Sequence, residues 1–178
     1  MVRCDDCGGT GRVPVHEAGH VVFACALCGA LQGDAAAVDA VESARRARER
    51  GFDPLVHPLV ECLEDLRGLT VVGASGGDPE RRIWPFVQFA VGTDGLGTVE
   101  NLVKTLRLGA ARHALHWIVE VEYAHRLVFA LKPRFHRSID AITPALVESA
   151  VADLDRIRRD LVSNQRLSWW RDGSNGPP

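Results

Sequence analysis

The stretch CDDCGGTGRVPVHEAGHVVFACALCGA, residues 4–30, decides the fold of the first part of this chain. Its four cysteines form two C-x-x-C pairs separated by seventeen residues, Cys4 with Cys7 and Cys25 with Cys28. A Zn²⁺ ion prefers four soft ligands in a tetrahedron, and two C-x-x-C turns supply two thiolates each. The spacing therefore predicts one structural zinc site built from all four cysteines.

The residues around these pairs fit that prediction. Each pair is followed by a glycine, Gly8 or Gly29, which can adopt a positive φ and so let backbone N–H groups point at the sulfurs. Two short β-prone runs, GRVPV and HVVFAC, lie between the pairs, and a hairpin through them brings the two turns together. A segment this small has little apolar core, so we expect zinc binding and folding to be coupled.

These residues resemble the zinc-ribbon class, and VFACALCG in particular is similar to the second knuckle of a ribbon. The segment CDDCGGTG also resembles the C-x-x-C-x-G-x-G unit of the DnaJ-type cysteine-rich domain, here in a single copy. The ribbon resemblance covers about the first 30 residues. It implies a zinc-ribbon domain over residues 1–34.

A competing motif lies between the pairs, from His16 to His20. HEAGH has the H-E-x-x-H form and is similar to the active-site helix of FtsH-type zinc metallopeptidases, which implies His16 and His20 as zinc ligands and Glu17 as the general base. On such a helix Cys25 would lie nine residues from His16, about 180° round the axis, and would face away from the metal. We therefore favour a hairpin turn here and keep the peptidase as the alternative.

Composition restricts the class of protein. The 178 residues are 46% hydrophobic and 25% charged, which excludes a disordered, collagen-like or coiled-coil chain. The formal net charge of −2 gives no strong attraction to nucleic acid or to anionic membranes. No run approaches the roughly 18–20 apolar residues of a membrane span, and the polar start MVRCDDCGGTGR lacks the apolar region of a signal peptide. We expect a cytoplasmic protein with no membrane partner.

The rest of the chain predicts a helical connector, an α+β domain and a tail. Residues 35–57 are rich in Ala and Arg, present a charged face typical of a solvated helix, and end at the breaker Gly51–Pro54. Over residues 58–165 the apolar periodicity gives the order α-β-β-α-β-β-α. Strand pairs separated by helices predict a mixed or antiparallel sheet with helices on one face. Residues 166–178 form the C-terminal tail.

Three details of the α+β domain are also predicted. Cys62 lies among leucines at helical spacing and is expected to be a small buried hydrophobe. The alternating runs HWIVEVEY and RLVFALKPRF predict an antiparallel hairpin in which Leu127 faces inward. Thr143 caps the last helix and Pro144 opens it.

Two weaker patterns suggest ligands. The glycine-rich loop over residues 73–78, followed by Arg81 and Arg82, could hold a phosphate, although a plain loop between strands is the preferred interpretation. The end of the predicted hairpin is basic and could contact RNA or an acidic partner, although a solvated face is preferred. Its histidines are His113, His116, His125 and His136.

The layout of residues 59–162 resembles the wybutosine-type tRNA methyltransferase fold, in which a helix leads into a strand that ends in a Ser-Ser-Cys turn. The corresponding place here reads Gly73-Ala74-Ser75-Gly76-Gly77 and lacks the cysteine, so no catalytic residue is carried over. The leading hypothesis is a non-enzymatic zinc-binding protein whose ribbon contacts nucleic acid or a protein. The alternatives are an H-E-x-x-H metallopeptidase and an RNA- or nucleotide-modifying enzyme.

Overall fold

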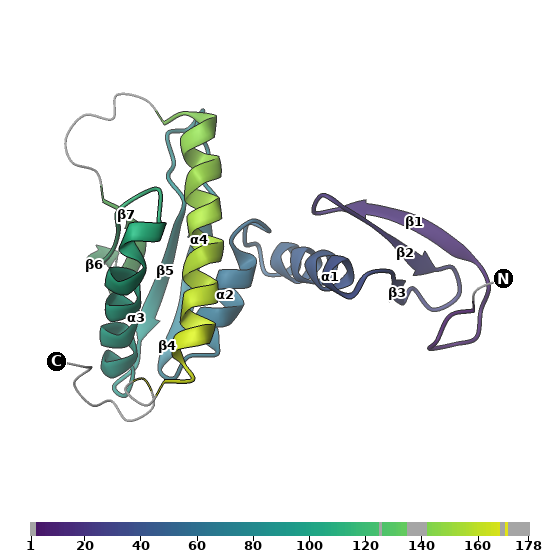
Figure 1. Cartoon of the computed structure of the whole chain (residues 1–178), viewed down its shortest axis with the longest axis horizontal. Coiled ribbons are helices and arrows are strands. Elements are labelled where there is room, and N and C mark those ends of the chain that lie inside the picture. Colours follow the sequence, from purple (N-terminus) through teal and green to yellow (C-terminus); the bar gives the residue numbers. More distant parts are fainter. Residues whose placement is uncertain (1–2, 125, 135–141, 168–169, 171–178) are drawn as a thin grey trace. The chain divides into compact units, whose positions relative to one another are not determined.

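The chain divides into two compact units with the boundary between Pro54 and Leu55 (Figure 1). A computed structural model describes residues 3–124, 126–134, 142–167 and 170. Among the helices so described, none combines the length and the apolar character needed to cross a membrane. The predicted α+β class is confirmed, because, in the part of the chain that the structure describes, an antiparallel sheet is combined with one α-helix in the first unit and with three in the second.

The first unit contains a three-stranded antiparallel sheet in the order β1-β2-β3. Its strands are β1 (Arg12–Glu17), β2 (His20–Cys25) and β3 (Leu31–Gln32). A two-residue turn joins β1 to β2, and both of its residues have positive φ, 51° at Ala18 and 75° at Gly19. Such a turn matches the right-handed twist of the strands and fixes their register.

Helix α1 (Ala35–Glu49) packs on one face of this sheet. Asp34 caps it, because its carboxylate accepts the N–H groups of Ala36 and Ala37 at 3.1 and 3.2 Å. The buried cluster between helix and sheet contains Val22, Ala37 and Val41, with partly buried Val15, Leu31 and Val38 against it.

This packing differs from the solvated connector expected over residues 35–57. The face that α1 buries is made mainly of small side chains, such as Ala44 and Ala47, rather than of large apolar ones. A stripe of alanines in an alanine-rich helix does not stand out as apolar periodicity, so the sequence shows only the charged side.

The second unit has the predicted order α-β-β-α-β-β-α, with a short 3₁₀ turn before β6. Its elements are α2 (His57–Glu64), β4 (Leu69–Ser75), β5 (Phe86–Val91), α3 (Leu96–Gly109), β6 (Trp117–Ala124), β7 (Arg126–Pro133) and α4 (Pro144–Asn164). The four strands form one antiparallel sheet in the order β4-β5-β7-β6, so that β6 is an edge strand. Helices α3 and α4 pack against each other, and α2 packs on both α4 and β4.

The core of the second unit lies between this sheet and its helices. Phe89 of β5 stacks on Phe129 of β7 with ring centroids 6.0 Å apart. Cys62 is 8% exposed, as predicted, and its burial raises the pKa of the thiol to about 11. Thr143 caps α4 as predicted, since its hydroxyl accepts the N–H of Leu146 at 3.3 Å.

The hairpin of β6 and β7 forms as predicted, but the side chains near its turn are not buried. Leu127, expected to face inward, is 65% exposed, and its cross-strand partner Tyr123 is 77% exposed. Alternation identifies which side chains share a face but not how far along a strand the covering helices reach. The predicted hairpin residues His125 and His136, and most of the tail 166–178, lie outside the described residues.

Candidate metal centre

The two C-x-x-C turns have the same backbone geometry. In each turn the glycine after the second cysteine donates its N–H to the carbonyl of the first cysteine, at 2.8 Å in the first turn and 2.9 Å in the second. The N–H of the first cysteine donates to the carbonyl five residues later, again at 2.8 and 2.9 Å. Both glycines have positive φ, 73° at Gly8 and 77° at Gly29, so a side chain at either position is strained.

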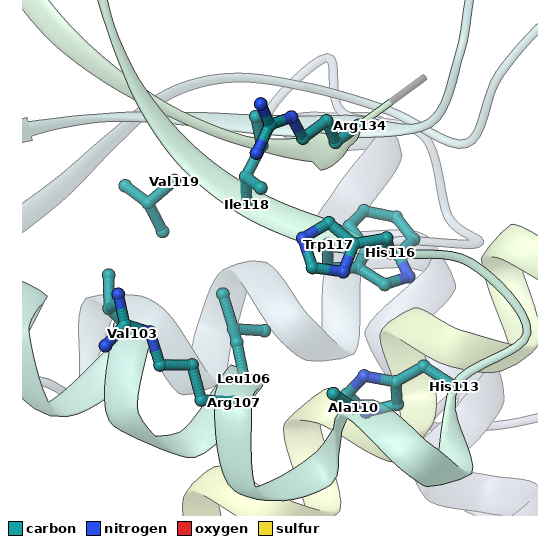
Figure 2. A pocket seen from close by; sticks show the side chains of 10 residues that line it. All are labelled: Val103, Leu106, Arg107, Ala110, His113, His116, Trp117, Ile118, Val119 and Arg134. Atoms are coloured by element: carbon teal, nitrogen blue, oxygen red, sulfur yellow. The ribbon is translucent and has the colours of Figure 1, made fainter. Parts of the chain in front are cut away.

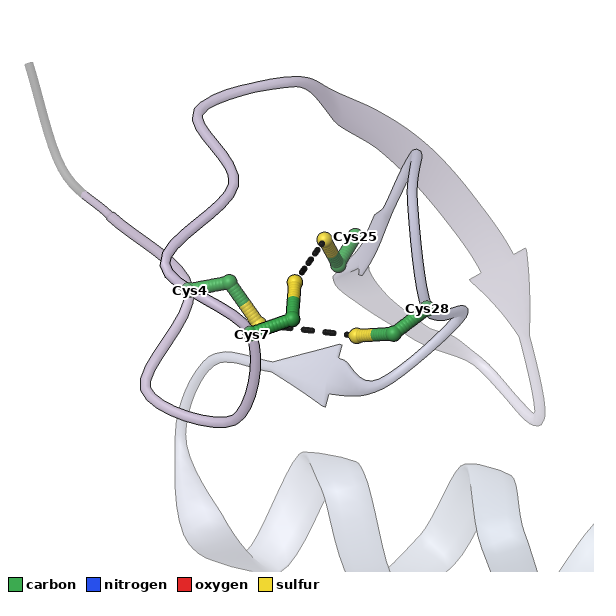
Figure 3. A group of neighbouring side chains, drawn as sticks. All are labelled: Cys4, Cys7, Cys25 and Cys28. Carbon is green, nitrogen blue, oxygen red and sulfur yellow. Dashed lines mark hydrogen bonds between the residues drawn. The ribbon is translucent and has the colours of Figure 1, made fainter.

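The four sulfur atoms converge (Figure 3). All lie within 4.8 Å of one another, with 3.7 Å between Cys4 and Cys28 and 3.5 Å between Cys7 and Cys25. A zinc ion bonded to four sulfurs at about 2.3 Å places those sulfurs about 3.8 Å apart. The cysteines predicted as ligands therefore form a cluster of the right size for a tetrahedral zinc ion, with two ligands from each turn.

Backbone N–H groups donate to the sulfurs of Cys7, Cys25 and Cys28, as the glycine positions suggested. The N–H groups of Cys28 and Leu27 donate to the sulfur of Cys25 and hold its pKa at about 6. The N–H of Gly9 donates to the sulfur of Cys7, but the neighbouring thiols, Cys28 foremost, raise the pKa of Cys7 to about 12. Four thiols in so small a volume cannot all ionise unless a cation balances their charge.

This donor set suits a structural metal ion better than a catalytic one. Four thiolates complete a tetrahedron and leave no position for water or substrate, unlike a catalytic zinc site with three protein ligands. Cys4 and Cys25 are buried, and Cys7 and Cys28 are exposed. Zinc held here would tie the start of the chain to the end of β2.

The HEAGH segment forms the end of the β1–β2 hairpin and not a helix. Cross-strand pairs join His16 to Val21 and Glu17 to His20. Because successive strand residues point to opposite faces, the side chains of His16 and His20 project from opposite faces of the sheet. Both histidines are exposed, and they do not belong to the four-cysteine cluster.

Glu17 has a partner that the sequence did not indicate. Its carboxylate forms ion pairs with Arg45, at 3.3 Å, and with Arg48, both on α1. Only 12% of its side chain is exposed. The sequence shows that Arg45 and Arg48 lie one turn apart and can bind the same carboxylate. Nothing in the sequence indicated that their helix packs against the hairpin that carries Glu17.

The glycine-rich loop between β4 and β5 satisfies its own amides. The carboxylate of Asp78 accepts the N–H groups of Glu80 and Arg81 at 3.0 and 3.1 Å, and Ser75 accepts the N–H of Gly77 at 3.1 Å. An isolated bridge pairs Asp78 with Ile83. The carboxylate thus occupies the place where a bound phosphate would accept these hydrogen bonds.

No protein family model matches the chain, and neither a curated protein nor a solved structure is similar to it. The zinc-ribbon resemblance is consistent with the cysteine cluster itself, and no family match supports the methyltransferase resemblance.

Proposed function

We propose that the first unit is a zinc-stabilised ribbon whose outer sheet face binds a protein partner. Exposed apolar side chains on that face, which we call the ribbon face, support this proposal. It comprises the side chains of β1 and β2 turned away from α1, chiefly Arg12, Pro14, His16, Val21 and Phe23. Val21 is 56% exposed and Phe23 41% exposed. Apolar side chains exposed together on a small rigid sheet are typical of interaction surfaces.

Charge favours a protein partner over nucleic acid. Residues 3–54 contain more acidic than basic side chains. The arginines of α1 are engaged within the unit, since Arg45 and Arg48 pair with Glu17 and Arg46 pairs with Glu42. Arg50, which follows the helix, lies over the ring of Phe52 at 4.9 Å from its centroid. A nucleic-acid interface needs several unpaired cations that can neutralise phosphates, whereas the ribbon face is largely apolar and carries one arginine, Arg12, at its end.

The zinc assignment is tested by metal content. We expect one zinc ion per purified wild-type chain. Cys25→Ser removes a ligand and should leave well under half of that zinc, while Cys62→Ser, a control outside the cluster, should keep it all. The double variant His16→Ala/His20→Ala should also keep one zinc per chain. Loss of zinc from the histidine variant would contradict the four-cysteine site and make Glu17 a candidate catalytic base again.

The contact role is tested by photo-crosslinking in cells of the source organism. A photoreactive amino acid replaces Phe23 on the ribbon face or Asp39, an exposed residue on α1 of the same unit. We expect a discrete protein adduct from position 23 only, and its loss when Cys25→Ser removes the zinc. An adduct that nuclease treatment removes would show that the partner is a nucleic acid and not a protein. Equal labelling from both positions would contradict the proposal.

A further inference from the structure

The second unit contains a cavity of about 320 Å³ between α3 and the edge strand β6 (Figure 2). Part of its wall is apolar: Leu106 and Trp117 are only 4% and 5% exposed, and Val103 and Val119 lie beside them. The remaining lining residues are Arg107, Ala110, His113, His116, Ile118 and Arg134. A concave site with apolar walls and a few polar groups is the usual form of a small-molecule site.

The charged groups of this cavity all have one sign. Arg107 comes from α3 and Arg134 follows β7, so two separate segments each contribute a guanidinium group (Figure 2). No carboxylate lines the cavity among the described residues. In the same part of the chain, neither Arg107 nor Arg134 has an ion-pair partner.

Most other described arginines of the second unit form ion pairs, while Arg82 and Arg166, which lie outside the cavity, do not. Arg67 pairs with Asp94 at 2.8 Å, Arg112 with Asp160 at 3.0 Å and Arg156 with Asp153 at 2.8 Å. Arg107 and Arg134, which have no ion-pair partner among the described residues, line the same cavity. An arginine presents a planar fork of donors that matches a carboxylate or a phosphate.

The histidines complete the polar wall. His116 is exposed and lines the cavity. His113 has a side chain only 2% exposed, and its Nε2 lies 3.8 Å from the carboxylate of Asp160 without a hydrogen-bond partner among the described residues. Burial lowers the pKa of His113, so this ring is neutral near pH 7 and the fixed positive charge comes from the arginines.

We propose that this cavity, the Arg107–Arg134 pocket, binds a small molecule that carries a carboxylate or phosphate group on an apolar body. The guanidinium groups bind the anionic oxygens, and the apolar body packs against Leu106 and Trp117. The pocket lies wholly in the second unit, so the inference is independent of the function proposed for the ribbon.

The test is calorimetric titration of the full-length, zinc-loaded protein with two probes, phenyl phosphate and 3-phenylpropionate. Inorganic phosphate and benzyl alcohol serve as comparison ligands, because phosphate lacks the apolar body and benzyl alcohol lacks the anionic group. We expect saturable binding of at least one probe, tighter than either comparison ligand. The tighter of the two probes identifies the preferred anionic group.

Variants locate that binding. The double variant Arg107→Gln/Arg134→Gln should weaken it at least about tenfold, because two charge-assisted contacts are lost. Val103→Glu places a carboxylate in the pocket and should have a similar effect. Arg67→Gln removes one positive charge outside the pocket and should change nothing. The proposal is overturned if neither probe binds, if a comparison ligand binds as tightly, or if the double arginine variant binds like wild type.

Discussion

At the scale of single residues, Asp153 connects α4 to the start of β6. Its side chain is fully buried and accepts four hydrogen bonds, from the N–H groups of Ala114 and Leu115, the indole of Trp117 and the guanidinium of Arg156, at 2.8–3.1 Å. Asp153→Ala leaves buried donors without an acceptor and should cost about 3 kcal/mol of unfolding free energy. Asp155→Ala, on the same helix with its side chain 52% exposed, should cost no more than about 0.5 kcal/mol. Urea denaturation compares the two, and equal costs would contradict this role.

The same carboxyl should make stability depend on pH. Burial opposes the charge of Asp153, but the N–H donors of Ala114 and Leu115, with Trp117 and Arg156, outweigh it and hold the pKa below its usual value. A folded-state pKa below the unfolded value of about 3.9 means that the stabilisation is complete above about pH 5 and is lost as the pH falls through the folded pKa. Asp153→Asn removes this titration. The difference in unfolding free energy between wild type and variant should therefore shrink from pH 5 to pH 2, and a constant difference would refute the assignment.

These residues show how far local chemistry can be predicted from sequence. The four-cysteine cluster was predictable because C-x-x-C followed by glycine encodes its own turn within a few residues, and two such turns suffice for a metal site. Asp153 and Glu17 were not, because their partners, apart from Arg156, lie 28–39 residues away in the chain. A single carboxylate on a helix or at a hairpin end is usually solvated, so only packing reveals its role.

At the scale of elements, α1 should contribute to zinc retention. Val41 is fully buried in the cluster between α1 and the sheet. Val41→Ala removes two methyl groups from that cluster, which should cost about 2 kcal/mol and loosen the ribbon. We expect zinc binding to be coupled to the folding of so small a unit, and the variant should therefore release zinc to a chromogenic chelator several-fold faster than wild type.

Asp39→Ala, an exposed change on the same helix, is the control and should release zinc at the wild-type rate. If α1 were a solvated connector, the two variants would behave alike.

Periodicity predicted the element order of the second unit because large apolar side chains define its strands and helices. The alanine face of α1 and the exposed end of the β6–β7 hairpin depend on which elements pack together, and that pairing is not encoded locally.

At the scale of the whole molecule, the two units differ in what stabilises them. The first has only a small buried cluster around Val22 and Val41, and a segment of that size usually needs a metal to fold. The second has a larger core that includes Phe89, Leu102 and Leu131 and contains none of the four clustered cysteines. Removal of zinc should therefore unfold the first unit and leave the second folded.

Hydrogen exchange followed by mass spectrometry, before and after treatment with a strong chelator, tests this difference. Amides of β1 and β2 should lose protection by at least about tenfold, because their hydrogen bonds then open with the ribbon. Amides of β5 and β7 should exchange at unchanged rates. Added zinc should restore the protection of β1 and β2, which distinguishes loss of the metal from irreversible damage. Protection of β1 and β2 that survives chelation would show that α1 alone stabilises the sheet, and simultaneous exposure of β5 would show that the units unfold as one.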